Sequence, residues 1–242
     1  MDNLTDKFSV FDYFNLIIGG AIFWLGVGIC NEAQLAEALS RISGEAEVSS
    51  VLIFLLIILA IVVSYITGAV LNECSHLVFK KGFKWEDGKI KNCLIDEVII
   101  GNPIKLHRYK QKASYYLNGT NSEVQEKFEP DQCAAFYAYC VYYIQVRNQN
   151  QKPERLREVQ GLSGLLTCVF AAIPIGTIIL SPTNISICER ICANSKDYLL
   201  CFVLAVIFLI KHHRDTTYRI RMVLATYDAC FDMCKTKTRN EE

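Results

Sequence analysis

Four uncharged stretches of the chain are candidates for membrane spans, and polar segments separate them. The longest are Ser49–Leu71, with 23 residues, and Gly161–Ile187, with 27. The other two are Tyr13–Cys30, with 18 residues, and Tyr198–Ile210, with 13. A helix needs about 20 apolar residues to cross the hydrocarbon core of a bilayer, and a soluble helix seldom lacks charge on every face over that length. The pattern therefore predicts an integral membrane protein.

The expected fold is mainly α: four transmembrane helices, with a small and mostly helical insertion between spans two and three. The parts follow one another along the chain as a first helix pair at 1–72 with spans at about 12–30 and 49–71, the insertion at 73–160, a second pair at 161–210 with spans at about 161–181 and 197–211, and an amphipathic tail helix at 211–242. The fourth span is short. Lys211 follows it and can extend toward the lipid headgroups, which favours a crossing.

The insertion contains two segments whose patterns need interpretation. Its start, GFKWEDGKIK, places Asp87-Gly88 between short alternating stretches, so a short β-hairpin fits there. Pro130 then opens an aromatic helix at about 131–147. This helix could form the core of the insertion or lie on the membrane surface. A fifth span is disfavoured, because it would export the basic segment at 152–157 or invert the tail.

Lysine and arginine are distributed unevenly between the segments that flank the apolar runs. Of 25 such residues, 14 lie in 72–160 and seven in 211–242, whereas 31–48 and 182–197 contain one and two. Loops rich in these residues stay on the cytoplasmic side of a membrane. We therefore expect a multi-pass protein of the cytoplasmic membrane, with the insertion and both termini in the cytoplasm.

Several residues are candidates for packing contacts. An apolar stripe on the tail, Leu224, Tyr227 and Phe231, is expected to pack on the aromatic face Phe136, Tyr139 and Tyr143, because both faces lie on the cytoplasmic side. Within the membrane, pairs of small residues allow close helix packing. These pairs are Ser64 with Gly68, and Ala172 with Gly176.

The sequence contains little that points to catalysis or to cofactor binding. It has 11 cysteines but no C-x-x-C pair, and no hydrolase, nucleotide-binding or zinc-protease motif, so no catalytic, cofactor or metal site is expected. Cys30, Cys188 and Cys192 would lie at the external face, where an oxidising environment would permit a disulfide. Nucleic acid is not expected as a partner.

The sequence resembles uncharacterised bacterial four-span membrane proteins in three segments. Their first span opens with an aromatic-Asp-aromatic element and a glycine, as do Phe11-Asp12-Tyr13 and Gly19-Gly20, although the proline common before that glycine is missing. The segments PERLREVQGLSGLL and HHRDTTYRIRMVLATYDACF are also similar. The resemblance implies a bacterial membrane protein, and some such proteins are thought to act in phage defence.

Together these patterns favour a non-enzymatic role. The expected function is to couple a cytoplasmic domain to a transmembrane bundle, as a sensor, an assembly partner or a membrane-acting effector. Its partners would be the bilayer and either further copies of the chain or a cytoplasmic protein. A small oligomeric channel is the alternative, and a membrane-bound enzyme ranks third.

Overall fold

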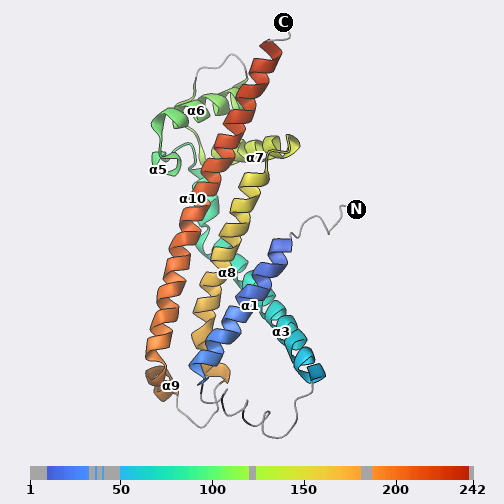
Figure 1. Cartoon of the computed structure of the whole chain (residues 1–242). Coiled ribbons are helices and arrows are strands. Elements are labelled where there is room, and N and C mark those ends of the chain that lie inside the picture. The colour runs from blue at the N-terminus through green and yellow to red at the C-terminus, as the bar shows by residue number, and fades with distance from the viewer. Residues whose placement is uncertain are drawn as a thin grey trace. The chain divides into compact units, whose positions relative to one another are not determined.

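The computed structural model describes residues 10–32, 36, 40, 50–119, 124–180 and 187–239. Within these residues every regular element is helical (Figure 1). The elements are α1 (Val10–Cys30), α3 (Ser50–His76), the π-helix η2 (Leu77–Phe83), α4 (Trp85–Lys91), α5 (Glu97–Ile100), α6 (Pro103–Asn118), α7 (Pro130–Val146), α8 (Gln151–Leu180), α9 (Ile187–Ala193) and α10 (Ser195–Arg239). The mainly α class is therefore confirmed. Most of the segments expected to be external, 41–49 and 181–186 among them, lie outside the described residues.

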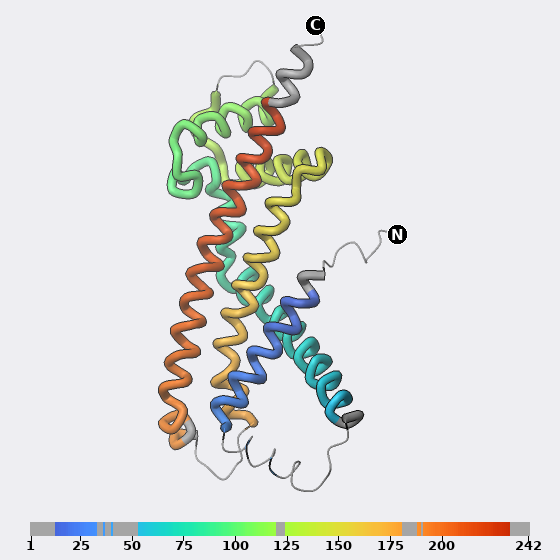
Figure 2. Tube along the Cα trace, viewed as in Figure 1, coloured from blue at the N-terminus to red at the C-terminus, as the bar shows by residue number. Residues whose placement is uncertain are grey.

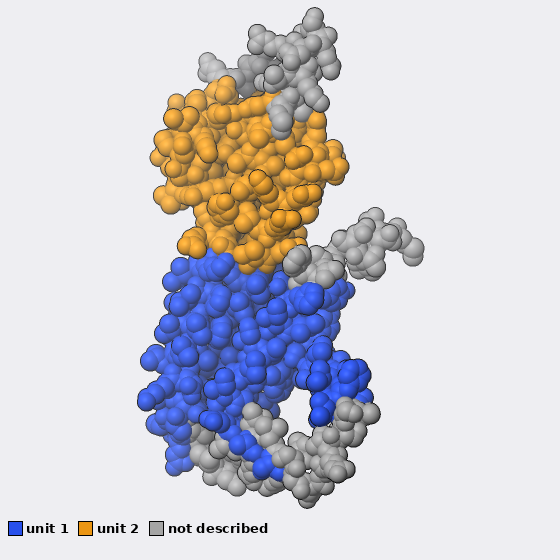
Figure 3. Space-filling view, viewed as in Figure 1, with its two compact units in different colours: residues 1–79, 161–212 blue, residues 80–160, 213–242 orange. Residues whose placement is uncertain are grey.

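The chain divides into two compact units, which Figure 3 distinguishes by colour. Unit 1 comprises 1–79 and 161–212, and unit 2 comprises 80–160 and 213–242. Three helical elements contribute to both units, and the first, η2, passes from unit 1 to unit 2 after Phe79. Helix α8 belongs to unit 2 as far as Gln160, and α10 belongs to unit 2 from His213 onward.

Among the residues that the structure describes, three helical segments are long and apolar enough to cross a membrane: Tyr13–Cys30, Ile53–Phe83 and Gln151–Leu180. These correspond to the first three expected spans, and they are compatible with a membrane protein. Helix α10 is not among them, because its uncharged run of 13 residues falls short of the about 20 that a crossing needs. The remainder of α10 is rich in charged residues.

The short β-hairpin predicted around Asp87-Gly88 is wrong, because residues 85–91 form helix α4. Lys84 adopts a left-handed conformation with φ 48° and turns the chain into this helix. Acidic residues then lie in its first turn and lysines in its last, as the helix dipole favours. Gly88 lies inside the helix, where its carbonyl accepts a bond from the Asn92 amide. An Asp-Gly pair predicts a turn only where neighbouring strands can pair, and here no strand is formed.

Helices α1 and α3 of unit 1 cross in close contact and then diverge (Figure 2). A Cβ atom added to Gly20 would lie 1.8 Å from the Ser64 carbonyl oxygen, and one added to Gly68 would lie 1.8 Å from that of Leu16. The backbones therefore touch at two points, each a glycine of one helix against the other. The Trp24 indole also donates a hydrogen bond of 3.0 Å to the Thr67 hydroxyl. Close glycine contacts with a polar link are typical of packing between membrane helices.

The core of unit 1 joins α1, α8 and α10. Its buried apolar residues are Val27, Cys30, Leu165, Val169, Ile173 and Cys201. Glycines again permit the approach, since a Cβ on Gly26 would lie 2.5 Å from the Ile173 side chain. In contrast, residues 53–62 of α3 are apolar and exposed along their whole length. Such a helix is stable only where lipid or another protein covers it.

The core of unit 2 is a separate cluster formed mainly by α6, α7 and α10. Its residues include Leu94, Leu106, Tyr109, Phe136, Cys140, Ile144, Ile220, Leu224 and Tyr227. Asn102 caps α6, because its side chain accepts bonds from the amides of Ile104 and Lys105. Glu129 and Gln132 form a capping box at the start of α7. Local signals thus fix where these helices start, and apolar burial holds them on α10.

We predict that Gly20→Ala destabilises the α1–α3 pair. The added methyl group would overlap a backbone atom, which cannot rotate away as a side chain can. Overpacking of this kind typically costs about 1–3 kcal/mol. Thermal unfolding in detergent should therefore begin at a lower temperature. Gly161→Ala is the matched control, because open space surrounds that position on α8. Equal unfolding temperatures for the two variants would contradict the close approach.

Candidate functional site

The aromatic cluster of unit 2 consists of Phe136, Tyr139 and Tyr143 on α7 with Tyr227 and Phe231 on α10. The Tyr227 ring lies at its centre, with centroids 5.7, 5.9 and 5.2 Å from those of Phe136, Tyr139 and Tyr143. Its contacts with these three rings are edge-on, the arrangement that aromatic quadrupoles favour. Only 1% of Tyr227 is exposed. The structure thus brings together the two aromatic faces that the sequence singled out.

Leu224 lies one turn before the aromatic cluster and is fully buried. It belongs to the same core as Ile220 and Val223 of α10. The candidate contact residues of the tail therefore share one buried face of this helix.

An ion-pair cluster fastens α6 to α10 beside the aromatic rings. Lys112 lies 2.6 Å from an oxygen of Asp228 and 2.8 Å from one of Asp232. Arg108 pairs with the same two carboxylates. A hydrogen bond from Lys112 lowers the pKa of Asp232 below its ordinary value. Sequence reasoning missed this cluster. Its signal was available in the i, i+4 spacing of cations on one helix and of acids on the other.

A second group of polar contacts joins α4 and the start of α8 to α10. Glu86 pairs with Arg219, and the Gln160 amide donates a 3.0 Å hydrogen bond to the Thr216 hydroxyl. Lys89 donates bonds of 2.6 Å to the His213 carbonyl and to the Thr217 hydroxyl. Burial lowers the pKa of Lys89 to about 8. These contacts hold the part of α10 between His213 and Arg219.

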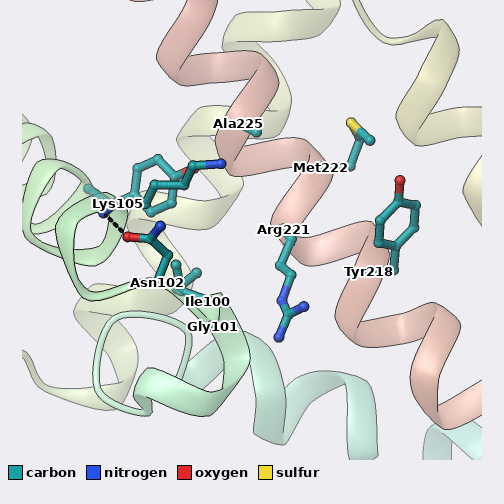
Figure 4. A pocket seen from close by; sticks show the side chains of 9 residues that line it. Ile100, Gly101, Asn102, Lys105, Tyr218, Arg221, Met222 and Ala225 are labelled. Carbon is teal, nitrogen blue, oxygen red and sulfur yellow. Dashed lines mark hydrogen bonds between the residues drawn. The ribbon is translucent and has the colours of Figure 1, made fainter.

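A hollow of about 340 Å³ lies between the start of α6 and one face of α10 (Figure 4). Its lining comes from two short stretches of chain: Ile100, Gly101, Asn102, Lys105 and Tyr109 on one side, and Tyr218, Arg221, Met222 and Ala225 on the other. Arg221 donates from its guanidinium to the carbonyls of Ile99 and Val98 at the end of α5. The lining contains two cations and no carboxylate, so the hollow is electropositive. No sequence motif predicted this hollow.

The cysteines expected at the external face are free thiols in the structure, Cys30 buried and Cys188 and Cys192 exposed. Their oxidation to a disulfide stays a prediction. In unit 2, Cys93 and Cys133 are also buried, and hydrogen bonding to Cys133 with burial raises the pKa of Cys93. Among the residues with described side chains, no group of three or more His, Cys, Asp and Glu is placed to hold a metal ion.

The small residues singled out for packing lie in unit 1. Ser64 and Gly68 face α1 at the crossing described above. Gly176 also packs on α1, because a Cβ there would lie 2.7 Å from the Phe23 ring. Ala172 is half-buried. Glycines of α1 complete this packing, although the sequence interpretation had not assigned them that role.

No protein-family model, curated protein or solved structure matches this chain.

We predict that Tyr227→Ala loosens unit 2 more than Tyr142→Ala does. Truncating a buried aromatic side chain typically costs about 3–5 kcal/mol. Tyr142 is a tyrosine of α7 that is 65% exposed, so it provides a matched control. Limited proteolysis of the full chain in detergent should cleave residues 80–160 faster in the Tyr227 variant only. Equal cleavage of both variants would show that the aromatic cluster does not hold α7 on α10.

We also predict that Asp232 contributes to the acid sensitivity of unit 2. Because its pKa is lowered in the folded state, its stabilising effect is present above its ordinary value of 3.8 and is lost as the pH falls through the folded pKa. The unfolding temperature is measured at about pH 7 and at about pH 3. Fluorescence of Trp85, in a Trp24→Phe background, monitors the unfolding. Asp232→Asn should lose less stability on acidification than the unchanged chain does. Glu126→Gln, at an exposed position, should behave as the unchanged chain.

Proposed function

We propose that this chain is a non-enzymatic, four-span protein of the bacterial cytoplasmic membrane that couples a cytoplasmic domain to a helical bundle. Unit 2 would be the cytoplasmic part, and it would act by sensing a ligand or by binding a partner. The observation that carries this proposal is the membership of α8 and α10 in both units. If the packing of unit 2 on either helix changes, the displacement can pass along that helix to its membrane span, because the backbone hydrogen bonds of the helix are continuous.

The partition of lysine and arginine supports the orientation. Residues 72–160 and the tail carry 21 of the 25 such residues, and both segments belong mainly to unit 2. They can lie on the same side of the membrane only if an even number of crossings separates them. Two crossings require the apolar run Tyr198–Ile210 of α10 to be the fourth span. Lys196 and Lys211 flank this run and can extend to the two headgroup regions.

The use of charge in unit 2 supports a coupling role over catalysis. Lys112, Asp228 and Arg219 are all half-buried or better protected, and each pairs with a side chain of opposite charge on another helix. Charges arranged in this way hold helices in register. They are not poised around a space where a substrate could react. The resemblance to bacterial proteins implicated in phage defence suggests a defence effector as one form of this role.

An oligomeric channel is the second candidate, and one observation favours it. The ten apolar residues at 53–62 of α3 are exposed in the part of the chain that the structure describes, and a second copy could pack on them as well as lipid can. Ion flux through liposomes that contain the purified protein, compared with empty liposomes, discriminates the two. Flux would favour the channel, and impermeable liposomes would favour coupling.

We predict the topology from the same argument. In a background with Cys74, Cys188 and Cys192 replaced by serine, one new cysteine is introduced at a time. Ser40→Cys should react with a membrane-impermeant maleimide in intact cells. Asp131→Cys and Ala229→Cys should react only after permeabilisation. If Ala229→Cys reacts in intact cells, the assignment of a fourth span is wrong. If Asp131→Cys reacts in intact cells, unit 2 lies on the external side of the membrane.

A further inference from the structure

Two cations face the hollow of unit 2 without a carboxylate to neutralise them. Elsewhere in this unit, Arg108, Lys112 and Arg219 each lie within ion-pair distance of an acidic side chain. Within the part of the chain that the structure describes, Lys105 and Arg221 make no ion pair. Uncompensated positive charge in a concave site concentrates anions there.

Arg221 also keeps donors to spare. A guanidinium has five N–H groups, and its bonds to the Ile99 and Val98 carbonyls use only some of them. The group lies close over the backbone of Gly101, since a Cβ at that glycine would be 3.0 Å from Nη2 of Arg221. Arg221 is thus held in place at the linker that leads into α6. A fixed guanidinium loses little further freedom when it binds an anion.

The hydroxyl of Tyr109 is a third polar group at this hollow. Tyr109 is only 3% exposed, and its hydroxyl has no hydrogen-bond partner among the described residues. Burial raises its pKa to about 12, so it remains a donor at neutral pH. Because this hydroxyl donates to no described residue, it can donate to a ligand in the hollow that Tyr109 lines.

The start of α6 does not by itself make this an anion site. Its first free amides, at Ile104 and Lys105, already donate to the Asn102 side chain. Recognition must therefore come from the side chains, with Tyr218 and Met222 adding apolar wall. The volume of about 340 Å³ lies in the range of sites for small organic molecules.

We propose that this hollow binds a phosphate group, carried by a small soluble molecule or by a lipid headgroup, through Lys105, Arg221 and the Tyr109 hydroxyl. A phosphate monoester bears a charge of roughly −1.5 to −2 at neutral pH, which matches the two cations. Its oxygens accept the hydrogen bonds that Lys105, Arg221 and Tyr109 can give. This proposal rests on the proposed function in one respect: a phosphate group would be the ligand that unit 2 senses. Binding can be measured whatever the topology.

Titration calorimetry on the full-length protein tests the proposal. The protein is placed in phosphatidylcholine nanodiscs, and inorganic phosphate and glycerol 3-phosphate are titrated in separately. In a second arm, nanodiscs that contain phosphatidic acid are compared with phosphatidylcholine alone by the temperature at which unit 2 unfolds. Heat of binding in the first arm identifies a soluble ligand. A rise in unfolding temperature in the second arm identifies a headgroup.

Three variants locate the response. Lys105→Gln should weaken binding about tenfold or more, as expected for loss of one charge-assisted hydrogen bond. Tyr109→Phe keeps the ring and removes the hydroxyl, so it should weaken binding without lowering the unfolding temperature of the free protein. Lys127→Gln makes the same charge change at an exposed position outside the hollow, and it should leave binding unchanged.

The proposal is overturned if neither arm gives a response, or if Lys105→Gln and Tyr109→Phe bind as the unchanged protein does. An equal loss in Lys127→Gln would also overturn it, because the effect would then be one of net charge. If the cysteine-labelling pattern differs from the one predicted but phosphate still binds, the proposed topology is wrong and the phosphate site is unaffected.

Discussion

The unbroken course of α10 is the constraint on which the other contacts depend. Its 45 residues contain no proline or glycine and form one helix. One end contributes Cys201 to the core of unit 1, and the other contributes Ile220, Leu224 and Tyr227 to that of unit 2. A helix of this length is stable only where tertiary contacts bury its apolar face, because intrinsic propensity adds little in water.

Within unit 2 the faces of α10 have distinct uses. Residues spaced at three or four positions bury apolar and aromatic side chains against α7. Adjacent positions carry Asp228 and Asp232, which bind the cations of α6, while Arg219 pairs with Glu86 of α4. Apolar burial supplies most of the stabilisation, and the charge pairs fix which helix lies where. Arg221 differs from these residues because it meets backbone carbonyls and borders the electropositive hollow.

Local sequence signals predicted the secondary structure correctly at some positions and wrongly at others. Pro130 opens a helix where the pattern predicted one, because an N-terminal proline acts within one turn. Asp87-Gly88 misled, because the same dipeptide that suits a hairpin can sit in a short helix once Glu86 and Lys89 bond to α10. The helical spacing of Leu224, Tyr227 and Phe231 predicted an apolar face on the tail helix. The many aromatic residues of 131–147 predicted the face that packs against it. The hollow could not be read in this way, since its two walls lie more than a hundred residues apart in the chain.

The sequence by itself determined that the chain is mainly helical and carries at least three segments able to cross a membrane, because length and lack of charge are sufficient for that conclusion. It also determined the aromatic face of α7 and the apolar stripe of the tail, since helical periodicity is a local property. Only the tertiary structure decided that Gly20 and Gly68 bring α1 and α3 into backbone contact. It alone paired Lys112 with Asp228 and brought Tyr109 and Arg221 to the lining of one hollow. These outcomes depend on which helix faces meet, and no local pattern fixes the meeting of segments distant along the chain.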